Sequence, residues 1–329
     1  MLLPDRSYHL YPLTQLQVFK DKCLVITGTT SGVGFVTAKT ALDAGMNVIV
    51  LNRQSVRVDE MLSRLNHHPR CTAVDCDLAS FESVRKAAAK VIALSNGCVD
   101  MLSNNAGIMA LPRSATVDGY EVQLQVNHLS HFLLTKLLMN SLINAADKNG
   151  SARIINHSSS IGDMVGDLDE NYYTRDSLKW GDDGRGMFWP QGGRWRRYAQ
   201  TKFANQVFTH ALHNKLQQAN IPIKVLAVHP GLAQTQLQPK AILHQSMSPR
   251  FTRWMFRWLG QSEADGALPM IHAIASQTVE SGCRVEPKRY LYGLPVVRKL
   301  RKRPLLSSTL DQLWQLSCEA VHESFDPVF

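Results

Sequence analysis

Short, unbroken apolar runs alternate with helix-like segments along most of this 329-residue chain. The clearest runs, Cys23-Leu-Val-Ile26 and Val48-Ile-Val-Leu51, contain no polar residue. Strands that are apolar on both faces are typical of a parallel sheet covered by helices on each side. The alternation therefore predicts a doubly wound α/β fold with right-handed crossovers.

The pattern predicts one mostly parallel, seven-stranded sheet of the Rossmann type in a single domain over residues 22–329, preceded by an arm at 1–21. Two long stretches interrupt the alternation and are expected to be insertions that border a binding site. The expected strands are 22–27, 46–51, 71–75, 99–104, 152–157, 223–229 and 289–293. The expected helices are about 33–44, 56–65, 80–95, 119–146, 197–219 and 263–277, and the insertions are about 163–197 and 236–262.

Composition and charge narrow the classes of function. The net charge of +9 suits anionic ligands such as phosphates or an acidic membrane surface, and no motif for nucleic acid is present. The six cysteines form no C-x-x-C pair and no zinc spacing with histidine, so we expect no metal and a reducing, cytoplasmic location.

Membrane contact is expected to be peripheral at most. No run approaches the roughly 18 apolar residues of a transmembrane helix, and the first residues do not resemble a signal peptide. The basic and aromatic stretch at 250–259 is a candidate either for weak contact with a membrane surface or for a lid over a substrate.

A glycine-rich turn, Thr27-Gly-Thr-Thr-Ser-Gly-Val-Gly34, lies directly between the first strand and the first helix. Glycine lets the backbone approach a ligand closely, and the start of a helix offers free N–H groups to a pyrophosphate. The turn therefore predicts a dinucleotide site. Its expected cofactor-binding residues are Gly28, Thr30, Ser31, Gly32, Val33 and Gly34.

The end of the second strand indicates which dinucleotide is bound. An NAD site usually has Asp or Glu there for the ribose 2′-hydroxyl, but this chain has Leu51-Asn-Arg-Gln54. Arg53 can bind a 2′-phosphate instead, so NADP(H) is favoured over NAD(H). After the third strand, Asp77 and Leu78 are expected near the adenine, unless Asp77 only caps the helix near Ser80.

Two later strand ends are expected to complete the cofactor site, because ligands of such sheets bind outside the carboxyl ends of the strands. Asn104-Asn-Ala-Gly107 closes the fourth strand, and His229-Pro-Gly-Leu-Ala-Gln-Thr235 follows the sixth. The expected cofactor contacts from these segments are Asn104, Ala106, Gly107, Pro230, Gly231 and Thr235.

Tyr198 and Lys202 lie four residues apart, so they share one face of a helix. A lysine ammonium held near a phenol favours the phenolate, which predicts a tyrosine pKa below its usual value of about 10. Such a tyrosine can exchange a proton with an alkoxide. We therefore expect Tyr198 to act as the acid or base and Lys202 to assist it.

A serine run follows the fifth strand, in Ile154-Ile-Asn-His-Ser-Ser-Ser160. Ser159 is the first candidate to hold a substrate carbonyl oxygen, and Ser158 and Ser160 could share or mimic that role. Strand alternation predicts that His157 is structural.

Asn127 lies in the middle of a long helix. A buried asparagine there needs partners, and it could anchor a water chain to Lys202. His128 and His131 have no third metal ligand nearby in the sequence, so no metal site is expected there.

Taken in order, the glycine turn, Asn104-Asn-Ala-Gly107, Asn127, the serine run, Tyr198-Ala-Gln-Thr-Lys202 and His229-Pro-Gly resemble the short-chain dehydrogenase/reductase superfamily over roughly residues 20–235. The segments 125–135 and 202–208 resemble more closely its retinol-dehydrogenase-like and WW-domain-oxidoreductase-like branch, which is mostly NADP-linked. The segment 313–319 resembles the C-terminal helix of that branch.

The resemblance implies roles for individual residues. Tyr198 would be the proton donor, Lys202 would lower its pKa and bind the ribose, Ser159 would orient the carbonyl, and Asn127 would complete the proton relay. Gly28, Gly32 and Gly34 would cradle the pyrophosphate. Two departures are the 39 residues from Ser159 to Tyr198, longer than is typical, and the lack of the hydrophobic N-terminal anchor of many retinol dehydrogenases.

We therefore predict an oxidoreductase that transfers hydride between NADP(H) and a small apolar carbonyl or alcohol. The alternative is a catalytically weak NADP(H)-binding regulator or interaction protein on the same fold. Expected partners are the apolar substrate and a second copy of the chain, in a homodimer or homotetramer built on helices 119–146 and 197–219.

Overall fold

The computed structural model describes residues 18–179, 183–184, 192–233, 241–244, 246–300 and 306–326. Within these residues the strands form one eight-stranded sheet in the order β3-β2-β1-β4-β5-β6-β7-β8. Neighbouring strands are parallel except β7 and β8, which form an antiparallel hairpin. The strands are β1 (Cys23–Thr27), β2 (Asn47–Asn52), β3 (Cys71–Asp75), β4 (Met101–Asn104), β5 (Ala152–His157), β6 (Ile223–Val228), β7 (Cys283–Pro287) and β8 (Pro295–Lys299).

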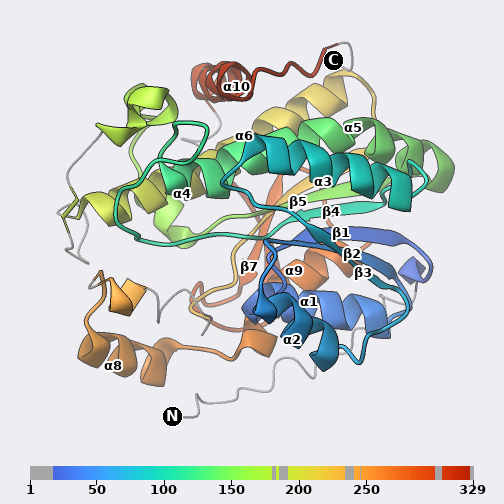
Figure 1. Ribbon diagram of the computed structural model, residues 1–329, viewed down its shortest axis with the longest axis horizontal. Helices are drawn as coiled ribbons and strands as arrows, with labels where there is room; N and C mark the ends of the chain where they lie inside the picture. The colour runs from blue at the N-terminus through green and yellow to red at the C-terminus, as the bar shows by residue number, and fades with distance from the viewer. Residues whose placement is uncertain are drawn as a thin grey trace.

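Helices cover both faces of the sheet, which confirms the doubly wound α/β fold (Figure 1). One face carries α3, α5 and α6, and the other carries α1, α2 and α9. The helices are α1 (Gly32–Asp43), α2 (Val56–Arg64), α3 (Phe81–Leu94), α4 (Val122–Leu124), α5 (Ser130–Asn149), α6 (Gly193–Gln218), α8 (Pro249–Leu259), α9 (Glu263–Ala275) and α10 (Ser307–Val321).

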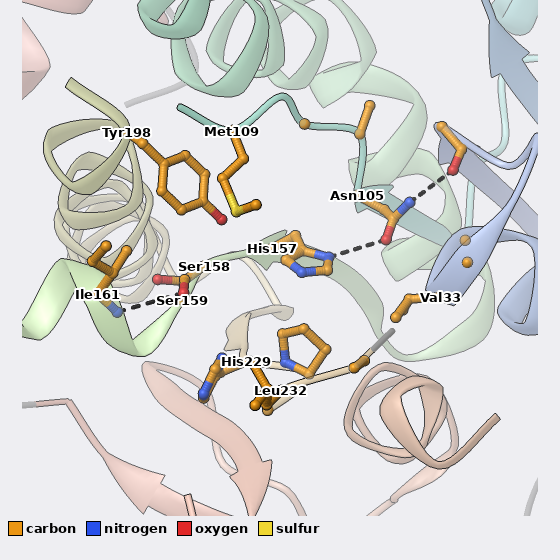
Figure 2. A pocket seen from close by; sticks show the side chains of 18 of the residues that line it. Val33, Asn105, Met109, His157, Ser158, Ser159, Ile161, Tyr198, His229 and Leu232 are labelled. Atoms are coloured by element: carbon orange, nitrogen blue, oxygen red, sulfur yellow. Dashed lines mark hydrogen bonds between the residues drawn. The ribbon is translucent and has the colours of Figure 1, made fainter. Parts of the chain in front are cut away.

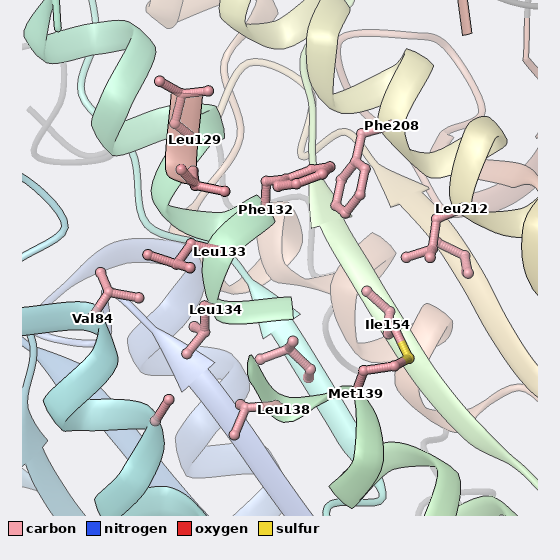
Figure 3. Packing of buried hydrophobic residues seen from close by; sticks show 14 of the residues in the cluster. Val84, Leu129, Phe132, Leu133, Leu134, Leu138, Met139, Ile154, Phe208 and Leu212 are labelled. Carbon is pink, nitrogen blue, oxygen red and sulfur yellow. The ribbon is translucent and has the colours of Figure 1, made fainter. Parts of the chain in front are cut away.

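The apolar core is split by the sheet into two layers, as a fully covered parallel sheet requires. In the layer under α5 and α6, the side chains of Phe132, Phe208 and Ile154 meet between helix and strand (Figure 3). The second layer packs α1 and α9 against the other face of β1 and β6. Strands buried on both sides explain why their sequences are apolar runs rather than alternating patterns.

The seventh strand was predicted in the wrong place. Residues 289–293, expected to be that strand, form the loop between β7 and β8, where Tyr290 and Gly293 have φ angles of 70° and 121°. The true strand β7 contains Arg284 and Glu286, which are 3% and 0% exposed and pair at 2.7 Å. Arg284 also pairs with Asp163, and Glu286 with Arg298. Buried ion pairs of this kind hide an interior strand from a prediction based on hydrophobicity.

The long helix predicted at 119–146 is in fact compound. It begins with the short α4, continues through a π-helical turn at Gln125–Leu129, and becomes the regular α5. The π-helical turn carries Asn127 and His128, which are both buried. Such turns are rare and are found mostly at functional sites.

The helix α10 lies across α5 and α6. Its Trp314 packs against Phe132 and Phe208, with ring centroids 5.4 Å and 6.2 Å apart, and Lys215 lies over the same indole. The α5 and α6 helices were predicted to form the interface between two copies of the chain. Part of their surface is instead covered by α10 of the same chain.

The predicted arm at 1–21 lies mostly outside the described residues. Among the described helices, none combines the length and the hydropathy needed to span a bilayer.

Candidate active site

A cavity of about 430 Å³ opens at the carboxyl ends of β1, β4, β5 and β6 (Figure 2). The strand order reverses between β1 and β4, and ligands of open α/β sheets bind at such switch points. The glycine turn forms one end of the cavity, and Ser159 and Tyr198 lie at the other.

The glycine turn is close-packed, so that two of its glycines cannot be replaced without a clash. A Cβ atom on Gly34 would lie 2.2 Å from the carbonyl oxygen of Gly28. A Cβ atom on Gly28, whose φ is +72°, would lie 2.7 Å from the Cα of Ala106. Asn52 braces the turn, since its Oδ1 accepts from the N–H of Thr29 at 2.8 Å.

Asn105 joins the glycine turn to the reaction end. Its Nδ2 donates to the carbonyl oxygens of Thr27 and Gly28 at 2.8 Å and 3.0 Å, and its Oδ1 lies 3.0 Å from Nδ1 of His157. With both amide hydrogens used on carbonyls, Oδ1 must accept, so His157 carries its proton on Nδ1. The Nε2 atom is then an acceptor.

His157 was expected to be structural, but it lines the cavity. Burial, with a smaller contribution from the Lys202 charge, holds the pKa of His157 well below its usual value, so its ring is neutral. Its backbone carbonyl accepts from Nζ of Lys202 at 3.0 Å. His229, after β6, lines the same cavity, and burial lowers its pKa to about 3.

Most of the predicted cofactor residues line this cavity. Arg53, Asp77, Leu78, Asn104 and Lys202, which was expected to bind the ribose, do not, and Thr235 lies outside the described residues. Those that do are Gly28, Thr30, Ser31, Gly32, Val33, Gly34, Ala106, Gly107, Tyr198, Pro230 and Gly231.

Local hydrogen bonds account for two of the residues outside the cavity. Oδ1 of Asp77 accepts from the N–H of Ala79 at 3.0 Å, while Ser80 rather than Asp77 caps α3. Asn104 is buried between strands, where its Nδ2 donates to Oδ1 of Asn156 at 2.9 Å. Its neighbour Asn105 faces the cavity instead.

Arg57 is a cavity residue that sequence reasoning missed. It lies in the first turn of α2, and its Nη2 donates to Oγ of Ser31 in the glycine turn at 3.1 Å. Arg53, four residues earlier, is exposed. The sequence did contain a signal for this contact. Arg57 follows Arg53 closely and lies at the start of a predicted helix, from which its side chain can reach back to the glycine turn.

Tyr198 and Lys202 lie on α6 and are both buried. Nζ of Lys202 is 5.7 Å from the centroid of the Tyr198 ring. Trp195 packs edge-on against the same ring, with centroids 6.0 Å apart. Tyr198 lines the cavity and Lys202 does not, and their proximity fits the shared helix face that their spacing predicts.

The pKa of Tyr198 is shifted upwards, whereas the sequence predicted a downward shift. Burial raises the pKa of Tyr198 to about 12, and a side-chain hydrogen bond with Ser159 lowers it only in part. Burial also lowers the pKa of Lys202 to about 7. The apolar surroundings disfavour the ammonium as well as the phenolate, so above neutral pH the lysine offers little charge.

The three serines occupy different environments. Ser158 also lines the cavity, but it is fully buried and its hydroxyl donates to the backbone carbonyl of Lys202 at 3.0 Å. Ser159 lines the cavity, as Tyr198 does, and its Oγ accepts from the N–H of Ile161 at 3.4 Å. Ser160 also lines the cavity and begins the 3-10 turn Ser160–Met164. Ser159 is the serine of the run that lowers the pKa of Tyr198.

Asn127 is buried behind the cavity. Its Oδ1 accepts from the N–H of Ile108 at 2.8 Å, and its Nδ2 donates to the carbonyl of Ile108 at 2.9 Å and to Oγ1 of Thr201 at 3.0 Å. The side chain thus joins the loop after β4 to α6 and contacts the neighbour of Lys202 rather than Lys202 itself.

His128 and His131 are buried and hydrogen-bonded within the fold. Nε2 of His128 lies 2.9 Å from Oγ of Ser317 on α10, and Nε2 of His131 lies 3.0 Å from Oγ1 of Thr27. No group of three or more potential metal ligands occurs in the part of the chain that the structure describes.

Apolar side chains form the rest of the cavity wall, and both insertions contribute. Trp195 comes from the first insertion, and Met247 and Phe256 from the second. Tyr172 in the first insertion instead packs inward, and its hydroxyl donates to Glu121 at 2.8 Å. The apolar lining residues include Met109, Ile161, Trp195, Leu232, Met247, Phe256 and Leu291.

Comparisons with known proteins show which families and structures this chain is similar to. The family model described as short chain dehydrogenase matches residues 22–174. Human retinol dehydrogenase 13 is 35% identical over 246 residues, which cover 72% of this chain and 67% of that protein. Human polyprenol dehydrogenase is 28% identical over 302 residues, covering 91% and 84%.

Solved structures show the same fold. An uncharacterised protein from Mycobacterium paratuberculosis superimposes with a TM-score of 0.71 at 29% identity, covering 93% of this chain and 96% of that one. Three other structures, at 21% or 22% identity and with TM-scores of 0.57 or 0.58, are complexed with NADP, NADH and NADPH.

Proposed function

The chain belongs to the short chain dehydrogenase family of oxidoreductases, in its retinol-dehydrogenase-like branch, and we propose that it interconverts apolar carbonyls and alcohols with NADP(H). One observation carries the proposal: Tyr198 and Ser159 both line one end of a cavity whose other end is a glycine turn. A proton donor and a dinucleotide cradle in one cavity are the two parts that carbonyl reduction needs.

When bound, the nicotinamide cofactor supplies the hydride that adds to the carbonyl carbon. Tyr198 gives its phenolic proton to the carbonyl oxygen, and Ser159 donates a hydrogen bond to the negative charge that develops on that oxygen. A raised pKa keeps Tyr198 protonated at neutral pH, as an acid requires. In its charged form Lys202 favours the resulting phenolate.

The preference for NADP(H) rests on two arginines. Arg57 reaches the glycine turn, Arg53 lies at the end of β2, and the segment 51–54 contains no acid for a ribose hydroxyl. Guanidinium groups bind phosphate through paired hydrogen bonds. We assign Arg57 as the first contact for the 2′-phosphate and Arg53 as an outer one.

The substrate class follows from the cavity wall and from the relatives. Trp195, Met247 and Phe256 form an apolar part of the cavity wall. The names of two relatives, retinol dehydrogenase 13 and polyprenol dehydrogenase, refer to isoprenoid alcohols. We therefore propose an apolar, isoprenoid-like aldehyde or alcohol as the substrate.

The principal test is Tyr198→Phe. This change should lower NADPH oxidation with an apolar aldehyde about a thousandfold, because it removes the proton donor, and it should leave NADPH binding intact. The matched control is Tyr173→Phe, since Tyr173 is also buried but its hydroxyl bonds Gln200. Equal turnover by the two variants would refute Tyr198 as the acid.

A second test separates the neighbouring serines. Ser159→Ala should lower turnover about a hundredfold by removing a donor to the reacting oxygen. Ser158→Ala should instead cost about 1 kcal/mol of stability, because it removes a buried hydrogen bond to the backbone of α6. Steady-state kinetics and thermal unfolding of both variants measure the difference, and a larger turnover loss in Ser158→Ala would reverse the assignment.

The alternative is an NADP(H)-binding regulator with little activity. The raised pKa of Tyr198 favours it, since a phenol with a pKa of about 12 is a weak acid. Tight NADPH binding by calorimetry, with no turnover across retinoid, polyprenoid and aromatic carbonyls, would establish the regulator and exclude the enzyme.

A further inference from the structure

The helix α8 presents an aromatic and basic face to the solvent. It stands at the edge of the molecule, apart from the layers that cover the sheet (Figure 1). Trp254 and Trp258 are 58% and 62% exposed, and Arg253 and Arg257 are exposed beside them. Spacings of four residues align the two tryptophans in one row and the two arginines in the next.

The opposite face of α8 belongs to the cavity. Thr252 and Phe256 are buried, and Phe256 lines the cavity together with Met247 from the segment just before the helix. The single helix α8 therefore separates the apolar wall of the candidate active site from the solvent.

The charge of this face identifies what it can contact. Residues 249–259 contain Arg250, Arg253 and Arg257 and no acidic residue, within a chain of net charge +9. Leu243, in the segment before α8, adds an apolar side chain that is 77% exposed. Tryptophans at the level of the headgroups, with arginines beside them, are the composition of helices that lie in the surface of an anionic bilayer.

We propose that the exposed face of α8 docks on an anionic lipid surface. Trp254 and Trp258 enter the headgroup region, and the arginines bind lipid phosphates and carboxylates. Docking in this orientation brings the apolar cavity wall next to the bilayer, in which isoprenoid-like molecules dissolve. Delivery of substrate from the bilayer rests on the proposed function, whereas the docking itself does not.

The test is co-sedimentation of the full chain with vesicles of phosphatidylcholine and phosphatidylserine, at low and at high salt, without cofactor or substrate. The unmodified chain should bind these vesicles, release them in high salt, and bind far less to phosphatidylcholine alone. Trp254→Ser with Trp258→Ser, and separately Arg253→Glu with Arg257→Glu, should each reduce binding at least tenfold.

The matched control is Lys86→Glu with Lys90→Glu, which makes the same change of charge on the exposed face of α3. It should reduce binding much less than the arginine pair does. No binding by the unmodified chain, or an equal loss in the α3 control, would overturn the proposal. Circular dichroism and thermal unfolding of every variant identify any loss that is due to misfolding.

Turnover assays separate this proposal from the proposed function. The Trp254→Ser, Trp258→Ser variant should reduce a water-soluble aldehyde at the unmodified rate and lose rate only on a substrate dissolved in vesicles. If this variant and the unmodified chain turned over the vesicle-dissolved substrate at equal rates, substrate would not be delivered from the bilayer through α8. Vesicle binding without any turnover by the unmodified chain would support docking and refute the enzyme.

Discussion

The two ends of the cavity are built from different parts of the polypeptide. The cofactor end is mostly backbone, with a close-packed glycine turn braced by the amides of Asn52 and Asn105. The reaction end consists of side chains, with Tyr198, Ser159 and Lys202 held by the packing of α6.

The two ends are therefore sensitive to different kinds of substitution. A backbone site depends on space, so a single added carbon can destroy it. A side-chain site depends on burial, which sets the protonation of its groups. Three experiments test whether the two ends differ in this way.

The largest effect is expected at the backbone end. In Gly34→Ala the new Cβ would lie 2.2 Å from the carbonyl oxygen of Gly28 and 2.5 Å from Nδ2 of Asn105, so the turn must shift. Overpacking of this kind costs about 1–3 kcal/mol. We expect NADPH affinity to fall by roughly a hundredfold, an effect of about 2.7 kcal/mol, as measured by calorimetry.

The control for that variant is Gly150→Ala, at the end of α5. Its φ is +80° and nothing lies within 4 Å of the added Cβ, so alanine there strains the backbone without a clash. It should cost about 1 kcal/mol of stability and leave NADPH affinity unchanged. Similar affinity losses in the two variants would mean that general destabilisation, not space in the turn, weakens binding.

The next effect tests burial at the reaction end. The pKa of Lys202 is about 7 in the folded chain, below its usual value, so above pH 7 the unfolded chain binds a proton that the folded chain does not. Stability from this group therefore rises from pH 7 towards pH 10 and is lost as the pH falls through that range. Relative to Lys202→Met, the unmodified chain should gain about 2 kcal/mol between pH 7 and pH 9.

Urea unfolding at the two pH values measures this difference. Lys90→Met, on the exposed face of α3, controls for the loss of a lysine as such and should show no comparable change. If the stability of Lys202→Met and that of the unmodified chain change equally between pH 7 and pH 9, burial does not lower the pKa of Lys202.

The smallest effect concerns a side chain at the backbone end. Arg57→Ala should weaken NADPH binding about tenfold and leave NADH binding nearly unchanged, because a charged hydrogen bond to a phosphate contributes about 1.5–3 kcal/mol. Arg53→Ala is the natural comparison and should have the smaller effect, since Arg53 is exposed and lies outside the cavity. A larger loss in Arg53→Ala would restore the sequence-based assignment.

Local patterns predicted the fold well. Unbroken apolar runs located six parallel strands, and the glycine turn was found at the end of β1. The failures depend on contacts between distant residues. β7 was missed because Arg284 and Glu286 neutralise each other inside the sheet, and their pairing is invisible in a hydrophobic pattern.

The candidate site shows the same division. Sequence spacing placed Tyr198 and Lys202 together, but the pKa of each depends on how deeply α6 is buried, which spacing does not reveal. His157 faces the cavity because Asn105, on another strand end, holds its ring. The catalytic roles of Tyr198, Ser159, Lys202 and Asn127 stay predictions until the variants are assayed.

The bridge through Asn105 has a consequence for the order in which ligands arrive. The carbonyls of Thr27 and Gly28, the amide of Asn105 and the ring of His157 are linked in series, and the backbone carbonyl of His157 accepts from Nζ of Lys202. A dinucleotide that displaces the turn as it settles would also move the lysine before any second molecule enters. We therefore expect sequential kinetics in which the dinucleotide enters first and leaves last.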